Sequence, residues 1–303
     1  MNRTTLPASA ILLLQMTSLA AEPVGTAYSP IQVSSTIEDR RIVEASGLAR
    51  SHLHADRLWV LNDGGSGPQL FAFGLDGKAH GSVSLRNATN TDWEDLASFE
   101  HDGKAWLLVG DTGDNEARRR HYTLYLVEEP AEPGGQKVAP LRRIRYTYPD
   151  GALDAEALAI DVASDSVYIL VKRTVPARLY RVSLFAGGET TQVAVMLGEI
   201  ASLPQPTQAD LDNALAHQSW HWQPTAMDFA RDGRMAVVLT YRGAYLFGRG
   251  PAESWQDALQ EPPLRLDLGG IALAEAAAFG YNDSLFITVE GKKPPLYRID
   301  PRP

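Results

Sequence analysis

Polar side chains that could hold a metal ion recur at two kinds of position along this chain. The first position opens a short apolar segment and holds Ser46, Glu94, Glu156, Thr225 and Glu275. The second position ends the strand-like segment that follows and holds Asn62 with Asp63, Asp111, Lys172, Thr240 and Glu290. Crowded carboxylates raise one another's pKa, so they need either a cation or protons among them. Because the donors are oxygen atoms of Asp, Glu and Asn, we expect a hard cation, and flexible loops favour Ca²⁺ over Mg²⁺.

Further polar residues lie beside these two positions. They are Asp92, Asp95, Asp154 and, within the loop GDTGDN, Asp114 and Asn115. Acidic and Asn residues at strand ends also form ordinary turns, and that alternative stays open for each residue. A turn does not require Glu, however, and Glu94, Glu156 and Glu275 share one position of the pattern. The recurrence therefore favours a ligand site.

Two cations, Lys172 and Arg173, interrupt the acidic positions. They either pair with the neighbouring acids or contact an anionic group of a ligand. The run from Arg118 to His121 also leaves two alternatives open, a solvated loop face or a clamp for phosphate or carboxylate.

Aromatic residues occur in two segments that we expect to open on the same face. Trp93 lies in one segment, and Trp220, His221 and Trp222 lie in the other. Aromatic rings above a polar mouth commonly stack on a sugar or another planar ligand. The alternative is a hydrophobic plug that packs the second segment onto the domain.

The elements that carry these residues repeat along the chain. Five segments share an apolar stretch, a turn rich in Asp, Asn and Gly, and a strand of β-branched and aromatic residues; they begin at Ala45, Trp93, Ala155, Pro224 and Ala274. A third strand-like segment follows each of them, and a fourth follows all but the last. The last unit reaches Pro303 without a fourth strand, so we expect residues 31–37 to supply it and to close a ring.

Four short strands per unit, repeated about every 48 to 69 residues, predict an all-β fold, the β-propeller. We expect five four-stranded blades in a single domain, residues 31–303. Six blades are the alternative, if residues 201–222 form a degenerate unit, but two prolines and the helix-like TQADLDNALAH favour an insertion there. The first strand of each blade lines the central channel of a propeller, so the recurring polar residues should meet at one mouth of that channel.

Composition excludes several classes of function. The 303 residues carry a formal net charge of −9 and include no cysteine. An acidic chain offers no basic field to phosphates, so we do not expect nucleic acid as a partner. Without cysteine there are no disulfides and no thiolate metal site. The sequence also lacks a G-x-S-x-G motif, a P-loop and a dinucleotide fingerprint.

The N-terminal residues have the pattern of a secretory signal. Arg3 is followed by a largely apolar stretch from Ala8 to Leu19 and by small residues up to Ala21, which predicts a signal peptide over residues 1–21. An uncleaved anchor is the alternative, but the stretch is short for a membrane span. We therefore expect a linker over residues 22–30 and a mature monomer that is periplasmic or secreted and has no membrane span.

Four short motifs stand out: SGL at residues 46–48, LWVLND ending at Asp63, FGLDGK ending at Lys78, and DWEDLA at residues 92–97. They resemble blade motifs of a broad group of secreted bacterial propellers, the phytase-like, gluconolactonase-like and SdiA-regulated proteins. The resemblance implies Ca²⁺ at the channel mouth and hydrolysis of phosphoesters or lactones. The acidic positions to which this carries over are Asp63, Glu94, Asp111, Glu156 and Glu275. Ser46, Thr225 and Lys172 depart from that pattern.

The sequence supports two hypotheses about function. In the first, an exported propeller uses Ca²⁺ to hydrolyse a small anionic ester or lactone, with Glu156 and Lys172 as catalytic residues. The expected metal ligands are Asp63, Glu94, Asp111, Glu275 and Glu290, and the expected ligand-binding residues are Asn62, Trp93, Asp114, Asn115, Arg118, Trp220, His221 and Trp222. In the second, the propeller is not an enzyme, any metal is structural, and the mouth binds a glycan, a peptide or a protein.

Overall fold

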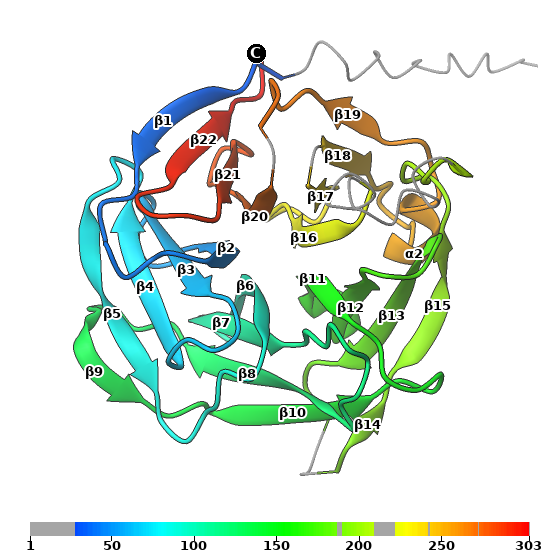
Figure 1. Ribbon diagram of the computed structural model, residues 1–303, viewed down its shortest axis with the longest axis horizontal. Coiled ribbons are helices and arrows are strands. Elements are labelled where there is room, and N and C mark those ends of the chain that lie inside the picture. The colour runs from blue at the N-terminus through cyan, green and yellow to red at the C-terminus, as the bar shows by residue number, and fades with distance from the viewer. Residues whose placement is uncertain (1–27, 187–189, 209–221, 242, 272, 303) are drawn as a thin grey trace, which may run out of the picture.

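The computed structural model describes residues 28–186, 190–208, 222–241, 243–271 and 273–302, and it confirms the five-bladed β-propeller. Five sheets surround a central channel (Figure 1). Two short helices lie wholly within the described residues, the 3-10 turn η2 (Val162–Ser164) and α2 (Trp255–Ala258). None of the described helices is long and apolar enough to cross a membrane.

The chain builds its blades in sequence order, and each blade begins with the strand nearest the channel. Blade 1 contains β2 (Ala45–Arg50), β3 (Arg57–Asn62), β4 (Gln69–Gly74) and β5 (Ala79–Leu85). Blade 2 contains β6 (Trp93–His101), β7 (Lys104–Asp111), β8 (Tyr122–Glu128) and β10 (Arg142–Thr147). Blade 3 contains β11 (Ala155–Asp161), β12 (Ser166–Val171), β13 (Ala177–Ser183) and β15 (Val195–Ile200). Blade 4 contains β16 (Pro224–Phe229), β17 (Met235–Thr240), β18 (Gly243–Gly248) and β19 (Leu264–Leu266). Blade 5 contains β20 (Ala274–Phe279), β21 (Leu285–Val289), β22 (Pro295–Ile299) and β1 (Gln32–Thr36).

The N-terminal strand closes the ring, as the sequence predicted. β1 pairs antiparallel with β22, with Gln32 opposite Arg298 and Thr36 opposite Pro295. Tyr28 also forms a bridge with Pro301 and is buried. Residues 28–30, which we expected in a linker, therefore belong to the fold. The predicted signal peptide and the rest of that linker lie outside the described residues.

Apolar side chains fill the spaces between neighbouring blades. Between blades 3 and 4, for example, Phe229 stacks on Trp255 with ring centroids 3.9 Å apart. The inner strands β2, β16 and β20 are buried along their whole length, so they show no alternation of apolar and polar residues. β2 approaches β6 so closely that a Cβ at Gly47 would collide with the backbone of Asp95 and Leu96, which is why glycine stands there.

Two buried carboxylates tie the inner strands together across the channel. Asp95 accepts hydrogen bonds from the backbone N–H of Leu158 in blade 3, at 2.8 Å, and of Met227 in blade 4, at 3.3 Å. Asp228 accepts one from Phe279 in blade 5, at 2.8 Å. The sequence placed Asp95 beside the mouth because it follows Glu94. Alternation along β6 instead directs its side chain into the channel, where it satisfies backbone groups of two other blades.

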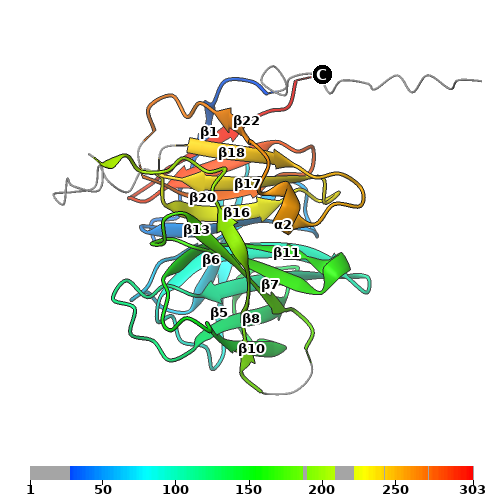
Figure 2. The same ribbon diagram turned by 90° about the vertical axis from the view of Figure 1, so that its right-hand side faces the viewer.

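Two blades carry a fifth strand that the sequence did not predict. β9 (Gly134–Val138) leaves blade 2 to pair in parallel with β5 of blade 1, and β14 (Gln192–Val193) leaves blade 3 to pair in parallel with β10 of blade 2. These strands cover outer edges that would otherwise be open to pairing with other chains. The alternative of six blades is wrong, because the five sheets complete the ring (Figures 1 and 2). Most of the helix expected within residues 201–222 lies outside the described residues.

Candidate functional site

Every inner strand begins with a β-bulge, and the bulges locate the first recurring position of the sequence. In each blade the pairing between the first two strands skips the second residue of the inner strand. The skipped residues are Ser46, Glu94, Glu156, Thr225 and Glu275. A bulge leaves one residue unpaired and re-aims its side chain. All of these except Thr225 line a cavity at the channel mouth, and the hydroxyl of Thr225 instead donates to Ala274 O at 2.8 Å.

The second recurring position is the residue that follows the second strand, and three of the residues predicted there, Asp63, Lys172 and Glu290, line the cavity. Tyr241 takes this place in blade 4, and the sequence analysis missed it by choosing Thr240. Asn62 and Asp111 lie one residue earlier, opposite the first residue of the inner strand. Neighbouring residues of a strand point to opposite sides, so an error of one residue changes the side chain that reaches the mouth.

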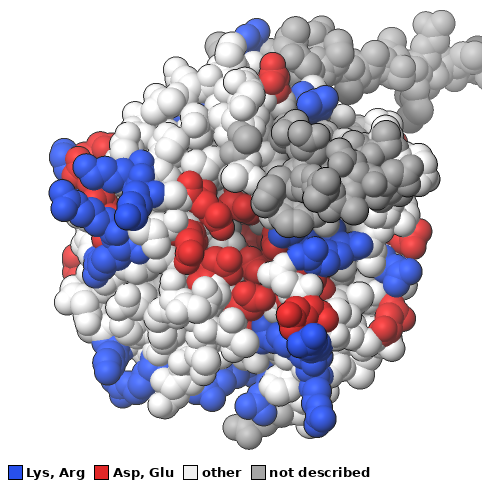
Figure 3. All heavy atoms as spheres, in the orientation of Figure 1, with Lys and Arg blue, Asp and Glu red and all other residues white. Residues whose placement is uncertain are grey.

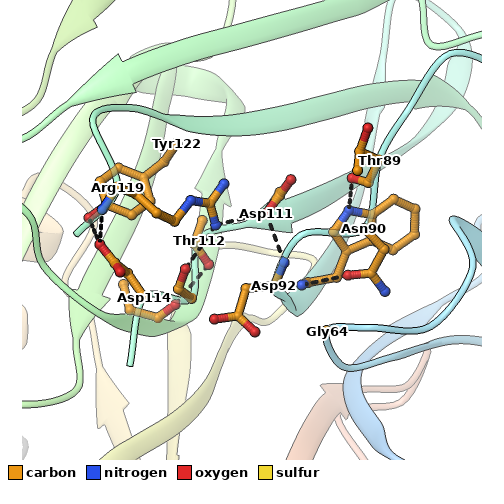
Figure 4. Close-up of polar contacts among 12 residues, drawn as sticks. Gly64, Thr89, Asn90, Asp92, Asp111, Thr112, Asp114, Arg119 and Tyr122 are labelled. Carbon is orange, nitrogen blue, oxygen red and sulfur yellow. Dashed lines mark hydrogen bonds and ion pairs between the residues drawn. The ribbon is translucent and has the colours of Figure 1, made fainter. Parts of the chain in front are cut away.

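This shift corrects the roles expected for Asn62 and Asp111. The Asn62 amide holds the segment before β2, because it accepts from the N–H of Val43 and Glu44, each at 3.2 Å. The Asp111 carboxylate accepts from the N–H of Asp92 at 3.1 Å and pairs with Arg119 at 2.8 Å, as Figure 4 shows. Neither residue lines the cavity, and both stabilise the loops around it.

The cavity at the mouth has a volume of about 260 Å³ and is strongly acidic. Figure 3 shows acidic side chains gathered in the hollow at the centre of this face. The lining carboxylates are Asp63, Glu94, Glu156, Glu275 and Glu290, and the lining cations are Lys172 and Arg173. We refer to this cavity as the acidic mouth.

Carboxylate oxygens in the acidic mouth come close enough to share one cation. Asp63, Asp92 and Glu94 each offer an oxygen within 4.8 Å of the others, and so do Glu94, Asp154 and Glu156. Glu94 belongs to both groups. The loop GDTGDN reaches this point through Gly113, where any side chain would collide with the carboxylates of Glu94 and Asp92. Glycine therefore allows the loop backbone to lie against the two acids.

Burial and mutual repulsion make Asp92, Glu94, Glu156 and Glu275 hard to ionise in the metal-free protein. Burial, with the Glu156 charge next to it, raises the pKa of Glu94 well above its ordinary value. Burial also raises the pKa of Glu156 to about 7 and that of Asp92 to about 6. Glu275 shifts strongly in the same direction, again because of burial and the charge of Glu156. A divalent cation would remove this penalty, because it stabilises the ionised forms.

Lys172 provides positive charge inside the acidic mouth. Its ammonium forms a very close ion pair with Glu156 and donates to the Tyr241 hydroxyl at 2.7 Å. Burial lowers the pKa of Lys172, but Glu156 and Tyr241 outweigh burial and raise it overall, so this side chain is charged at neutral pH. Arg173 pairs with Asp154 at 2.7 Å. Glu156 and Asp154 thus each have a paired cation. In the described residues no cation pairs with Asp63, Asp92 or Glu94.

The loop after β7 does not bring its acidic and basic side chains to the acidic mouth as expected. Asp114 accepts from the N–H of Arg118 at 2.9 Å, the N–H of Arg119 at 2.8 Å and the hydroxyl of Tyr122 at 2.8 Å, so it folds the loop rather than binding a ligand (Figure 4). Arg118 is 78% exposed and pairs with Glu116, outside the cavity. Asn115 does line the cavity, where its side-chain oxygen accepts from Arg173.

The prediction that Trp93 stacks on a ligand is wrong. Its side chain is fully buried between blades 1 and 2, and its indole N–H donates to Thr89 O at 3.0 Å. Trp93 is the first residue of β6, and its ring enters the interface core rather than projecting over the mouth. Trp222 is partly exposed, whereas Trp220 and His221 lie outside the described residues.

Comparisons with known proteins bear on the fold alone. No family model matches the chain, and no curated protein matches it in sequence. The allergen Mala s 1 of Malassezia sympodialis is similar in structure, with a TM-score of 0.51 and 11% identity over 88% of this chain and 95% of that one. The soluble aldose sugar dehydrogenase of Escherichia coli has a TM-score of 0.48 and 8% identity over 91% and 100% of the two chains. A luciferin-regenerating enzyme has a TM-score of 0.45 and 10% identity over 88% and 94%. The likeness to Mala s 1 indicates a shared architecture alone, and any activity must be argued from the site itself.

Proposed function

We propose that the acidic mouth binds a divalent cation, Ca²⁺, and that the protein uses it to hydrolyse a small anionic ester or lactone. The observation that carries this proposal is the pair of carboxylate groups that share Glu94 inside an open cavity of about 260 Å³. Oxygen ligands from flexible loops and strand ends suit Ca²⁺ better than the strict octahedral geometry of Mg²⁺.

Asp63, Asp92 and Glu94 are the residues that would hold the cation. They fit the role because each offers a carboxylate oxygen and because the described residues pair no cation with them. The hydroxyl of Ser46, which donates to Glu94 at 3.1 Å, would orient that ligand from behind. When bound, the cation would supply polarisation of a carbonyl or phosphoryl oxygen.

The remaining side chains of the acidic mouth suit substrate binding and proton transfer. Lys172 is charged and would attract the anionic group of the substrate. Glu275 has a raised pKa and no hydrogen-bond donor within the described residues, so its carboxylate is well suited to accept a proton from an attacking water. Glu156, which we expected to be catalytic, is tied to Lys172, and we assign it the role of positioning that ammonium.

The same ion pairs favour a second candidate function. If Lys172 and Arg173 serve only to neutralise Glu156 and Asp154, the cation is structural and the protein binds a ligand without reacting with it. A non-catalytic propeller would keep the cation site and lack turnover. Trp93, now placed in the core, no longer supports stacking on a glycan.

Calorimetric titration of EDTA-stripped protein with Ca²⁺, Mg²⁺ and Zn²⁺ tests the cation site. We expect saturable Ca²⁺ binding that weakens at least about 100-fold in Glu94→Gln, because that substitution removes a charged ligand from both groups. Glu128→Gln is the matched control, since Glu128 is exposed and pairs with Lys104 away from the mouth. Binding of Ca²⁺ would be followed by a screen of phosphoesters and lactones with the Ca²⁺-loaded protein. Absence of binding by all three cations would overturn the proposal.

A further inference from the structure

A second cavity opens at the end of the channel opposite the acidic mouth. It has a volume of about 320 Å³ and is lined by the last residues of the inner strands, including Arg50, Glu100, Asp161 and Asp228. Trp255 of α2 also lines it. In the edge-on view of Figure 2, α2 lies at the side of the ring away from the face shown in Figure 1. We call this space the lower cavity.

The lower cavity is lined by buried hydrogen-bond donors that lack acceptors. The Arg50 side chain is only 5% exposed, and its Nε has no hydrogen-bond partner in the described chain. The His52 side chain is 2% exposed, and its Nδ1 already lies 3.5 Å from the Glu100 carboxylate. The indole N–H of Trp255, like the Nε of Arg50, is buried and unpartnered. Leaving such groups unsatisfied costs about 1–3 kcal/mol each, so an acceptor inside this cavity would be favourable.

The acids around the lower cavity, in contrast, already have partners. Asp228 accepts the N–H of Phe229 at 2.9 Å and that of Phe279 at 2.8 Å. Glu100 pairs with Arg231 at 2.7 Å, and Asp161 pairs with Arg249 at 3.2 Å. Arg50 forms an ion pair with Asp228 at 3.8 Å and donates through Nη1 to Phe279 O at 3.5 Å, which leaves its Nε–H without an acceptor. The unmatched donors are therefore the Nε–H of Arg50 and the indole N–H of Trp255, and Arg50 is the charged one of the two.

Apolar side chains complete the lining. Phe99, Ile160, Phe229 and the stacked Trp255 give the lower cavity flat, apolar walls beside the donors. The lining thus combines apolar side chains with charged ones, and 320 Å³ is near the lower limit of the usual size of a site for small organic molecules. A guanidinium binds a carboxylate through two parallel hydrogen bonds.

We propose that the lower cavity binds a small organic molecule that carries a carboxylate, with Arg50 and Trp255 as the donors to that group. This site is independent of the acidic mouth and of the function proposed there. The two lie at opposite ends of the inner strands and share no lining residue.

Titration of the full chain in EDTA with sodium benzoate tests this site, with benzyl alcohol and inorganic phosphate as comparison probes. We expect saturable benzoate binding, a rise in Tm with benzoate, and no comparable effect from benzyl alcohol or phosphate. Arg50→Met should weaken benzoate binding at least about tenfold, because it removes a charge-assisted interaction. Arg57→Met is the matched control, since Arg57 is also buried but lies outside the lower cavity.

A second variant keeps the test decisive if Arg50→Met does not fold. Ala163 is exposed at the rim of the lower cavity, so Ala163→Trp should obstruct entry and abolish benzoate binding without disturbing the core. Glu94→Gln, which removes the cation site, should leave benzoate binding unchanged. No binding of benzoate would mean that the lower cavity holds only water, and it would overturn the proposal. Equal binding of benzyl alcohol, preference for phosphate, or unchanged affinity in Ala163→Trp would overturn it as well.

Discussion

The two ends of the channel are built from the same inner strands but have opposite chemistry. At the acidic mouth, carboxylates outnumber the cations that face them, and their pKa values are raised. In the lower cavity the acids are paired, and the unpartnered groups are the donors of Arg50 and Trp255. The two ends therefore differ in the kind of group that lacks a partner, and the difference depends on which side chains stand at the two ends of each inner strand.

Local backbone geometry explains why the two ends differ. Each inner strand begins with a bulge that re-aims one side chain, and in every blade except blade 4 this side chain lines the acidic mouth. The opposite ends pair regularly, as where Arg50 lies opposite Leu58. Side chains there come from strand ends, from the turn that carries His52 and from the helix that carries Trp255. The acidic mouth is thus a repeated feature, whereas the lower cavity is assembled from residues that do not repeat.

The largest effect that separates the two ends concerns the pH dependence of stability at the acidic mouth. Glu156 has a pKa of about 7 in the folded protein and an ordinary value of 4.5, so the folded state keeps a proton that the unfolded chain releases in this window. Without metal, the free energy of unfolding should therefore fall as pH rises from 4.5 to 7. At about 1.4 kcal/mol per pKa unit, Glu156 alone contributes on the order of 3 kcal/mol.

Urea unfolding of EDTA-treated protein across this pH range measures that slope. Glu156→Gln should flatten the slope, and Ca²⁺ should restore stability above pH 7, because the cation replaces the protons. Glu128→Gln should leave the slope unchanged. A slope that persists in Glu156→Gln at full size would contradict the assignment of this titration to the acidic mouth.

The titration of His52 in the lower cavity should change the free energy of unfolding with pH in the opposite direction and by a smaller amount. Burial and the neighbouring charge of Arg50 lower the pKa of His52 to about 4, although Glu100 acts in the other direction. The unfolded chain therefore binds a proton between pH 6.5 and 4 that the folded protein does not, and stability should fall as pH falls through this window. At pH 5 the loss should be about 2 kcal/mol, from the shift of about 1.4 kcal/mol per pKa unit.

His52→Gln should remove this loss of stability at acid pH. The free energy of unfolding, compared at pH 5 and pH 7, measures the loss. The other groups near His52 are Arg231, paired with Glu100, Tyr281, whose hydroxyl donates to His52 O at 2.9 Å, and Glu129, which accepts from the His52 N–H at 2.8 Å. His54→Gln is the control, because His54 is half-buried and lies outside the lower cavity. If His52→Gln and His54→Gln lose the same stability between pH 7 and pH 5, the two ends of the channel do not differ in the way that we infer.

The sequence predicted the ring and the acids at its mouth because blades repeat. Five recurring segments were enough to predict the five blades, the closing strand and the positions of Glu94, Glu156 and Glu275. The second strand was harder, because the hairpins before it differ in length. The turn spans residues 51–56 in blade 1 but only residues 102–103 in blade 2. The prediction took the last residue of the second strand in blades 2 and 4, Asp111 and Thr240, whereas the residue after that strand lines the mouth in blade 4, as Tyr241.

Other features could not be predicted because they depend on contacts between distant segments. The residues around Trp93 do not indicate whether its ring stacks on a ligand or packs between two blades. The structure places Trp93 in the core between blades 1 and 2. β9 follows a strand of blade 2 but pairs with blade 1, and β14 follows a strand of blade 3 but pairs with blade 2. The lower cavity joins Arg50, His52 and Trp255 from separate parts of the chain, so no motif marked it.

The smallest expected effect tests whether the exposed loop after β7 contributes to the difference between the two ends. Arg118 was a candidate anion clamp, but it is 78% exposed and pairs with the exposed Glu116 at 2.6 Å. Such pairs contribute little, so Arg118→Ala should change the free energy of unfolding by less than about 0.5 kcal/mol and leave Ca²⁺ affinity within about twofold. Calorimetry and urea unfolding measure both. A larger loss of affinity would show that the loop reaches the acidic mouth in solution. An unchanged affinity means that the charge of the mouth is set by the strand ends, because the solvated loop adds positive charge without placing it near the carboxylates.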